Sequence, residues 1–286
     1  MKTPLLIIGS IALAAVGVGV WYSAADNIPE VQFSDIEAGF EEAENPADVA
    51  SVGVKNEQQI PQQVAASGGF SRWGFYWREF SEEEKRFYEN FKRPEGPLRV
   101  GLQAGHWKNG EVPGELSGLK RNGDGAVGGG RSEAEVVLEI ARRTKALLEK
   151  EGIAVDLLPA TVPKNYIADT FISIHADGNG NPSVSGFKIS GSRRDFSGKA
   201  PKLVEALYES YGRETGMSRD SSISRRMSGY YAFNWRRYEH AVRPMTPAVI
   251  IETGFMTSLE DRMIIVDHPE RAAKGIAGGI INFLLK

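Results

Sequence analysis

Histidine and carboxylate side chains that could bind a metal or move a proton lie at the ends of three short apolar runs. His106 and His175 each follow one run, and Glu252 lies near the end of the third, just before a glycine. The runs span residues 98–104, 171–174 and 246–255. Short apolar runs bounded by glycine and turn formers are typical of buried strands. Because ligands of α/β proteins collect at the carboxyl ends of strands, we expect these side chains to share one site.

Glu133 is a fourth candidate, and it occupies the first position of a predicted helix. Ser132 and Glu135 have the spacing of a capping box, which marks a helix N-terminus. Apolar residues then recur every three or four positions to about Glu151, as expected for an amphipathic helix. A carboxylate at this position is also stabilised by the positive end of the helix dipole, so Glu133 has a structural interpretation beside the functional one.

The combination of His106, Glu133 and His175 fits one Zn²⁺ ion, with Glu252 as the general base. Catalytic zinc commonly has three His or carboxylate ligands and an open fourth position. The metal polarises a carbonyl and lowers the pKa of water, and an unliganded glutamate then carries the proton to the leaving nitrogen. Burial of Glu252 in its apolar strand would raise the pKa of this carboxyl and suit it to proton transfer. The predicted reaction is amide hydrolysis.

Each of these residues also has a structural interpretation when it is taken alone. A histidine at a strand end is often a hydrogen-bonded structural residue, and a buried glutamate is often half of an ion pair. The chain contains no HExxH motif, so spacing alone does not identify a zinc hydrolase. The group of four favours catalysis because every member lies where a strand ends or a helix begins.

The composition of the 286-residue chain excludes several classes of protein. A hydrophobic content of 41% is enough for one core of ordinary size, which predicts one folded domain with appendages. The net charge of -3 provides no basic surplus, so we expect no nucleic-acid partner. The chain has no cysteine, which excludes disulfides and thiolate zinc sites. His, Asp and Glu are therefore the candidate metal ligands.

Residues 1–25 are predicted to be a membrane anchor or a signal peptide. An uncharged apolar run from Pro4 to about Tyr22 follows Lys2, and its length is close to the roughly 20 residues that cross a bilayer. Trp21 and Tyr22 favour a retained single-pass anchor, whereas the small residues at 23–25 favour a cleaved signal peptide. Both interpretations place the rest of the chain outside the cytoplasm, in the periplasm or cell wall.

Two further segments precede the catalytic region. Residues 26–69 are acidic and rich in Gln, Ala and Pro, which predicts a flexible, disordered linker. Residues 70–96 are rich in aromatic side chains, and Ser81 with Glu84 has the spacing of a capping box. We interpret this segment as a helix that braces the catalytic domain. An aromatic arm that contacts sugar, and a lipid-surface contact, are the alternatives.

Predicted helices and strands alternate along residues 97–286, which indicates an α/β catalytic domain. We expect further strands at 153–158, 185–190 and 229–234, and helices at 199–216 and from 269 to the C-terminus. The loop between His106 and Ser132 is rich in Gly, Lys and Asn and has no apolar run. We expect this loop to line or cover the site and to add little to the core.

Four segments of the chain resemble the signature motifs of the zinc-dependent N-acetylmuramoyl-L-alanine amidases, which cut cell-wall peptidoglycan. They are Ala104-Gly-His106, Ser132-Glu133 at the helix start, Phe171-Ile-Ser-Ile-His175-Ala-Asp177, and Pro247-Ala-Val-Ile-Ile-Glu252-Thr-Gly-Phe255. The resemblance extends from about Leu98 to the C-terminus.

The resemblance implies a fold, a site and an activity. The implied fold is a central twisted mixed sheet flanked by helices. The implied zinc ligands are His106, Glu133 and His175, and the implied catalytic residue is Glu252. The implied reaction is hydrolysis of the amide bond between N-acetylmuramic acid and the L-alanine of the stem peptide, in cell-wall remodelling or lysis.

The chain departs from the usual pattern of that family at positions beside the ligands. Trp107 and Lys108 stand where glycines are frequent, Leu158-Pro159 replaces a usual Thr-Arg pair, and Asp177 stands where Asn is common. None of these departures removes a ligand. They bear on substrate contacts and on the geometry of the loops.

Two other functions compete with the amidase interpretation. One is a zinc peptidase that cuts the stem peptide itself, and the other is a non-catalytic wall-binding protein on the same fold. The second would show a lost ligand or base, whereas all four residues are present. The expected partners are peptidoglycan and, through a retained anchor, the membrane. The sequence leaves open an activator protein that would uncover the site.

Three other side chains, His240, Arg243 and His268, lie outside these motifs. His240 is a candidate for substrate contact or for a proton partner, because it lies shortly before the Glu252 strand, but the sequence does not decide its role. Arg243 is a candidate for binding a stem-peptide carboxylate. His268 precedes a proline at a helix start, which favours a structural role.

Overall fold

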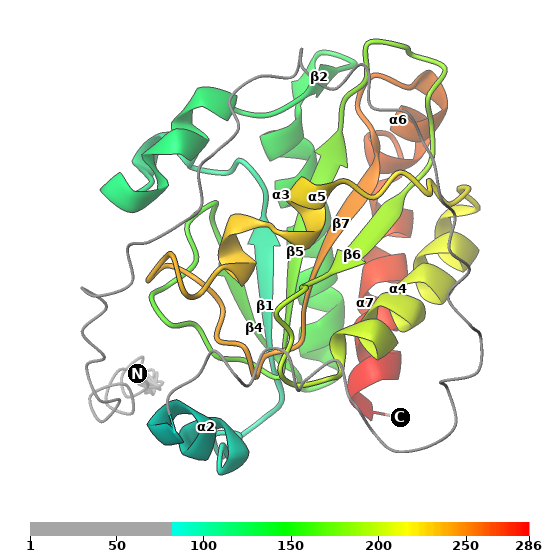
Figure 1. Ribbon diagram of the computed structural model, residues 1–286. Helices are drawn as coiled ribbons and strands as arrows, with labels where there is room; N and C mark the ends of the chain where they lie inside the picture. Colours follow the sequence, from blue (N-terminus) through cyan, green and yellow to red (C-terminus); the bar gives the residue numbers. More distant parts are fainter. Residues whose placement is uncertain (1–81, 286) are drawn as a thin grey trace, which may run out of the picture. The chain divides into compact units, whose positions relative to one another are not determined.

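The computed structural model describes residues 82–285, which fold around a five-stranded sheet (Figure 1). The strand order is β4-β1-β5-β7-β6. The strands are β1 Arg99–Ala104, β4 Ala154–Leu158, β5 Thr170–Asp177, β6 Lys188–Gly191 and β7 Ala248–Phe255. The first four strands in that order are parallel, and β6 runs antiparallel to β7. The predicted central mixed sheet is therefore confirmed.

Long helices cover one face of the sheet (Figure 1). They are α3 Glu133–Lys150, α4 Ala200–Thr215 and α7 Pro269–Leu285, and the shorter α6 Leu259–Ile265 packs beside them. Side chains alternate along a strand, so Ile172, Ile174 and Ala176 of β5 all point to this face. Each of the three is fully buried in the main core. Ser173 and His175, which alternate with these residues, therefore point to the opposite face of the sheet.

Short helices cover the opposite face. They are the 3-10 helices η1 Asn109–Glu111, η2 Gly114–Asn122 and η3 Tyr231–Phe233, and the one-turn helix α5 Arg225–Ser228. Phe171 of β5 packs against Phe233, and Val112 and Leu116 are buried in the same cluster. The expectation that the loop after His106 adds little to the core is therefore wrong. Its apolar residues are separated in sequence, but the 3-10 turns bring them together.

The prediction of a strand at 229–234 is also wrong, because this segment contains a 3-10 helix. Tyr231–Phe233 forms η3, with hydrogen bonds from Phe233 N to Tyr230 O and from Asn234 N to Tyr231 O. All three residues of η3 are buried. A strand exposes alternate side chains to two faces, so a tight turn buries three consecutive side chains more effectively where the chain crosses a sheet.

The predicted start of α3 is confirmed at the level of its hydrogen bonds. Ser132 Oγ accepts from Glu135 N at 3.4 Å, and Glu135 Oε2 accepts from Ser132 N at 2.8 Å. The strands β2 Val127–Gly128 and β3 Arg131–Ser132 form a small hairpin directly before the helix. Glu133 therefore begins α3 in a fixed position.

The helix α2, Glu82–Glu89, contacts the catalytic domain through Tyr88. The Tyr88 ring lies 6.3 Å from the rings of Phe196 and of Trp235. The predicted anchor or signal peptide at 1–25, the linker at 26–69 and most of the aromatic segment lie outside the described residues. Among residues 82–285, none of the helices combines the length and apolar character needed to span a membrane.

Candidate metal centre

His106 and His175 meet at the carboxyl ends of the neighbouring strands β1 and β5. Gly105 N donates a hydrogen bond to Ile174 O at 2.9 Å, which joins the two strand ends. The two imidazole rings lie 5.2 Å apart and are nearly perpendicular, at 80°. A Cβ atom at position 105 would lie 2.4 Å from His175 Cε1, far inside van der Waals contact. Glycine at this position therefore makes the close approach of His175 possible.

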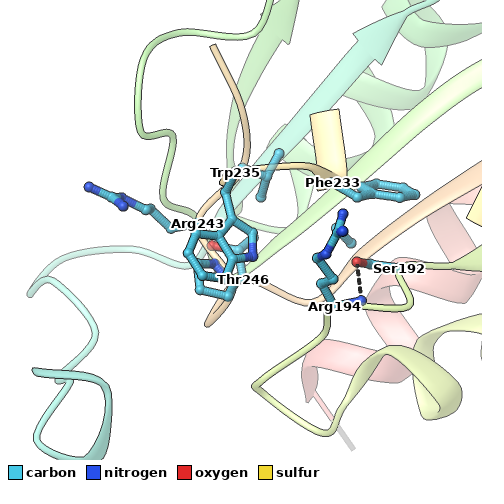
Figure 2. Close-up of a pocket in the computed structure, with 9 residues that line it drawn as sticks. Ser192, Arg194, Phe233, Trp235, Arg243 and Thr246 are labelled. Atoms are coloured by element: carbon cyan, nitrogen blue, oxygen red, sulfur yellow. Dashed lines mark hydrogen bonds between the residues drawn. The ribbon is translucent and has the colours of Figure 1, made fainter. Parts of the chain in front are cut away.

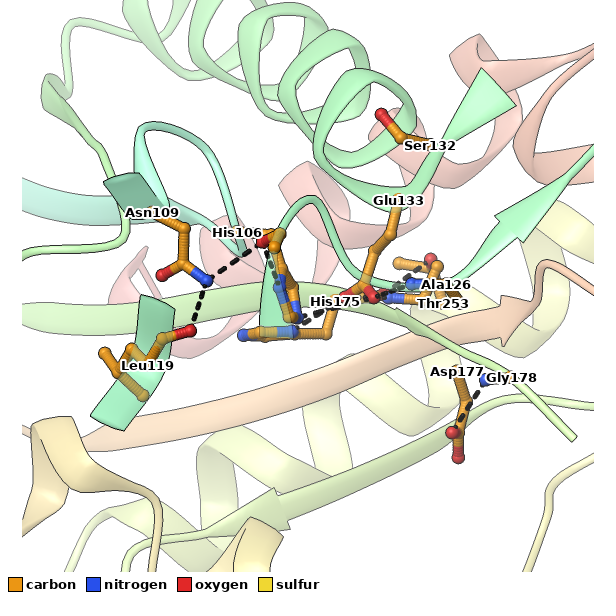
Figure 3. Close-up of polar contacts among 12 residues, drawn as sticks. His106, Asn109, Leu119, Ala126, Ser132, Glu133, His175, Asp177, Gly178 and Thr253 are labelled. Carbon is orange, nitrogen blue, oxygen red and sulfur yellow. Dashed lines mark hydrogen bonds and ion pairs between the residues drawn. The ribbon is translucent and has the colours of Figure 1, made fainter. Parts of the chain in front are cut away.

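Glu133 reaches both imidazoles from the first turn of α3 (Figure 3). Its Oε1 lies 2.8 Å from His175 Nδ1, and its Oε2 lies 3.5 Å from His106 Nε2. Ala176 N and Ala126 N donate to the same two carboxylate oxygens, at 3.2 and 3.1 Å. One ligand atom from each of the three side chains lies within 4.8 Å of the others. The structure thus brings together the three predicted metal ligands.

The second ring nitrogen of His106 is held by a backbone carbonyl. His106 Nδ1 lies 3.2 Å from Gly123 O, and a carbonyl can only accept, so this nitrogen carries the proton. Asn109 Nδ2 donates to Gly123 O at 2.9 Å and to Leu119 O at 2.8 Å, as Figure 3 shows for Leu119. The loop after His106 is thereby tied to the site, and His106 Nε2 is left free to face Glu133.

The three side chains of the cluster shift the pKa values of one another. Burial opposes ionisation of Glu133, but the hydrogen bond and charge of His175, with a contribution from His106, lower the pKa of the Glu133 carboxyl below its ordinary value. Burial likewise disfavours the imidazolium of His175, but Glu133 outweighs it and raises the pKa of His175. Burial is the main cause that lowers the pKa of His106, and the charge of His175 adds to it. An ionised carboxylate beside imidazoles suits a cation site.

Glu252 lies beside the cluster on the next strand. It is the register partner of His175 across β5 and β7, so both side chains project from the same face of the sheet. Its Oε2 is buried without a hydrogen-bond partner. Burial raises the pKa of Glu252 to about 7, the charges of Glu133 and Asp177 add to the rise, and His175 opposes it. A carboxyl with this pKa can both accept and release a proton near neutrality.

Three polar residues around the cluster were missed in the sequence analysis. Tyr230 Oη lies 3.3 Å from His175 Nε2, and Gln103 Oε1 accepts from Tyr230 Oη at 3.0 Å. Lys188, the register partner of Glu252 on β6, forms ion pairs with Asp177 at 2.7 Å and with Asp220 at 2.9 Å. The polar Gln103 within a strand of apolar residues was a visible signal. No pattern in the sequence indicates the role of Tyr230, because its contact with His175 depends on the path of a loop.

His240 and His268 lie outside the cluster. His240 Nδ1 lies 2.5 Å from Glu115 Oε1, and the same residue lines an open pocket with Lys108. A role of His240 in substrate contact stays a prediction. His268 Nδ1 lies 3.3 Å from Glu270 Oε1 near the start of α7, in an exposed position. This position is consistent with the structural role that we expected.

Arg243 lies at the amino end of β7, whereas Glu252 lies toward its carboxyl end. It lines a small cavity with Trp235, Arg194 and Ser192 (Figure 2). Arg243 Nε is buried without a hydrogen-bond partner. The expectation that Arg243 binds a substrate carboxylate gains no support from this position, because the ligand cluster is at the other end of the sheet.

Comparisons with known proteins agree with this site. The sequence model of a family described as N-acetylmuramoyl-L-alanine amidase matches residues 100–282. The N-acetylmuramoyl-L-alanine amidase AmiA of Salmonella typhimurium is 26% identical over 205 residues, which cover 56% of this chain and 71% of that protein. The N-acetylmuramoyl-L-alanine amidase LytC of Bacillus subtilis is 25% identical over 173 residues, which cover 56% of this chain and 32% of that protein.

A solved structure, the N-acetylmuramoyl-L-alanine amidase AmiC2 of Nostoc punctiforme, is 22% identical and superposes with a TM-score of 0.49, over 68% of this chain and 100% of that chain. The family match covers the three residues of the cluster and Glu252, and it spans more than half of the chain. The chain therefore belongs to the N-acetylmuramoyl-L-alanine amidase family and is a peptidoglycan hydrolase.

Proposed function

We propose that this amidase is zinc-dependent, with His106, Glu133 and His175 as the ligands of one Zn²⁺ ion and Glu252 as the general base. The bond cut is the amide between the lactyl group of N-acetylmuramic acid and the first alanine of the stem peptide. The observation that carries this proposal is the convergence of three ligand atoms within 4.8 Å, beside a carboxyl that has no partner for its buried oxygen.

The donor atoms fit Zn²⁺ better than Mg²⁺ or Ca²⁺. Two imidazoles and one carboxylate are a standard set for catalytic Zn²⁺, which keeps a further position open. Mg²⁺ and Ca²⁺ prefer sites made of oxygen ligands alone. The outer nitrogens of both histidines have partners, Gly123 O for His106 and Tyr230 Oη for His175. Ligand histidines in zinc sites commonly show such outer hydrogen bonds, because these fix the ring and its tautomer.

The protein residues divide the catalytic work among them. A Zn²⁺ ion at this site would polarise the scissile carbonyl and lower the pKa of the attacking water. Glu252 takes the proton of that water, and it then donates a proton to the nitrogen of the departing alanine. A pKa of about 7 allows Glu252 to do both.

The substrate also indicates where the enzyme acts. Peptidoglycan lies outside the cytoplasmic membrane, so we infer that the catalytic domain works there. The predicted anchor or signal peptide at residues 1–25 would deliver the domain to that side. A retained anchor would restrict the enzyme to wall close to the membrane, and a cleaved signal peptide would release it.

Product analysis tests the proposed bond directly. Purified peptidoglycan is incubated with the full-length chain and excess Zn²⁺, and the products are separated and identified by mass spectrometry. The proposal predicts stem peptides with a free alanine amino terminus and glycan strands that keep intact lactyl groups. Shortened stem peptides that remain attached to the glycan would instead indicate a peptidase.

A further inference from the structure

The hydroxyl of Tyr230 lies behind His175, on the side of the ring away from Glu133. His175 Nδ1 faces Glu133 Oε1 at 2.8 Å, and His175 Nε2 faces Tyr230 Oη at 3.3 Å. Tyr230 comes from the segment between α5 and η3, which crosses the face of the sheet opposite the long helices. The two nitrogens of one imidazole therefore have different partners, one in the ligand cluster and one outside it.

The side-chain amide of Gln103 determines the direction of the hydrogen bonds. Gln103 lies fully buried in β1, and its Nε2 donates to Ala160 O at 2.9 Å. A carbonyl oxygen can only accept, so the amide nitrogen must be on that side and Oε1 must be on the other. Gln103 Oε1 then accepts from Ser173 Oγ at 2.7 Å and from Tyr230 Oη at 3.0 Å.

This direction fixes the role of the tyrosine hydroxyl. The proton of Tyr230 Oη is committed to Gln103, so its oxygen is an acceptor for His175 Nε2–H. In the metal-free protein His175 Nδ1–H faces Glu133 Oε1 at 2.8 Å, and a metal ion that binds there would take the place of this proton. His175 would then keep its proton on Nε2, with the lone pair of Nδ1 directed at the metal. A histidine binds a metal through its unprotonated nitrogen, and the partner of the other nitrogen decides which one that is.

We propose that Tyr230, held by Gln103, is a positioning residue that selects the tautomer of His175 and so presents Nδ1 to the metal. This inference rests on the proposed zinc site. The corresponding partner of His106 is the backbone carbonyl of Gly123, which holds the opposite ring nitrogen, Nδ1. The partner of His106 belongs to the backbone, whereas the partner of His175 is a side-chain hydroxyl. A substitution of Tyr230 can therefore remove the partner of His175 without changing the backbone.

The packing of Tyr230 allows the hydroxyl to be removed alone. Its ring contacts the rings of Tyr231 and Phe233, with centroids 4.8 and 5.7 Å away. Phenylalanine at this position keeps these contacts and the shape of the side chain. Tyr166 is a matched control, because its hydroxyl donates to Asp156 Oδ2 at 2.7 Å and the ring is buried, but it lies away from the ligand cluster.

The first test compares zinc affinity in three full-length proteins. The wild-type chain, Tyr230→Phe and Tyr166→Phe are titrated with Zn²⁺ against a chromogenic chelator. We expect a dissociation constant roughly 10- to 100-fold higher in Tyr230→Phe, the range typical for loss of an outer partner of a ligand. Tyr166→Phe should bind zinc like the wild type. Equal affinity in all three proteins would overturn the role of Tyr230, and failure of the wild type to bind zinc would overturn the proposed zinc site instead.

A second measurement needs no variant. Nitrogen-15 NMR of the ring of His175 in the zinc-loaded wild-type protein reports which nitrogen carries the proton. The inference predicts a proton on Nε2 and the metal on Nδ1. A proton on Nδ1 would overturn it, even if the Tyr230→Phe variant failed to fold.

Discussion

His175 and Glu252 are register partners on the neighbouring parallel strands β5 and β7. This pairing places a candidate metal ligand and the candidate base side by side on the same face of the sheet. A register shift of one residue would turn Glu252 to the opposite face, into the core formed by the long helices. The relative position of ligand and base is therefore set by strand pairing, and it needs no flexible loop.

Replacement of Glu252 by glutamine tests the base directly. Glutamine has almost the same shape but cannot accept the proton of water, so Glu252→Gln should lower turnover by about 100-fold or more. Because Glu252 is not one of the three predicted ligands, bound zinc should be unchanged. Dye release from labelled peptidoglycan measures turnover, and elemental analysis measures zinc. Activity close to that of the wild type would remove Glu252 from the mechanism.

Loss of a ligand histidine should remove metal and activity together. His175→Ala deletes the imidazole that faces Glu133 at 2.8 Å, and the remaining two ligands should not retain Zn²⁺ through gel filtration. The control is His268→Ala, which changes an exposed histidine outside the cluster. Elemental analysis of both variants after gel filtration provides the comparison. A full equivalent of zinc in His175→Ala would refute the ligand role.

A methyl group at position 105 should displace His175. The Cβ of Gly105→Ala would lie 2.4 to 2.7 Å from three atoms of the His175 ring, so the ring must move. We expect much weaker zinc binding. Turnover should fall about 10-fold or more, as it does when a ligand histidine loses its outer hydrogen-bond partner. Gly110→Ala is the matched control, because no atom lies within 4 Å of its new Cβ. Equal zinc affinity in the two variants would show that the site tolerates movement of His175.

The capping box of α3 should contribute to stability. Ser132→Ala removes the side-chain acceptor for Glu135 N and should lower the free energy of unfolding by about 0.5–2 kcal/mol. The exposed Ser221 supplies a control substitution to alanine. Urea unfolding of the metal-free proteins measures the difference. No change in Ser132→Ala relative to Ser221→Ala would mean that the hairpin before α3 alone fixes the position of Glu133.

The elements that the sequence predicted well depend on local patterns. The short apolar runs before His106 and His175 appear as β1 and β5, and the capping box places the start of α3 at Glu133. Periodicity and capping involve residues a few positions apart, so they can be recognised without knowledge of the fold. The three predicted ligands come together because each lies at the end of such an element.

The elements that were missed depend on contacts between distant parts of the chain. Tyr230 meets His175 across 55 positions, and His240 meets Glu115 across 125 positions. The path of the segment from α5 to η3 over the sheet decides these contacts, and no local pattern encodes that path. The same reason explains why the residues at 229–234 were expected to form a strand and the loop after His106 was expected to lie outside the core.

The most direct test of the account is the position of zinc in a crystal of the zinc-loaded protein. Anomalous diffraction collected on both sides of the zinc absorption edge locates the ion independently of the protein atoms. The account predicts one peak bound by His106 Nε2, His175 Nδ1 and the Glu133 carboxylate, with Glu252 close by but not coordinated. A peak at other residues, or no peak in protein that hydrolyses peptidoglycan, would contradict it.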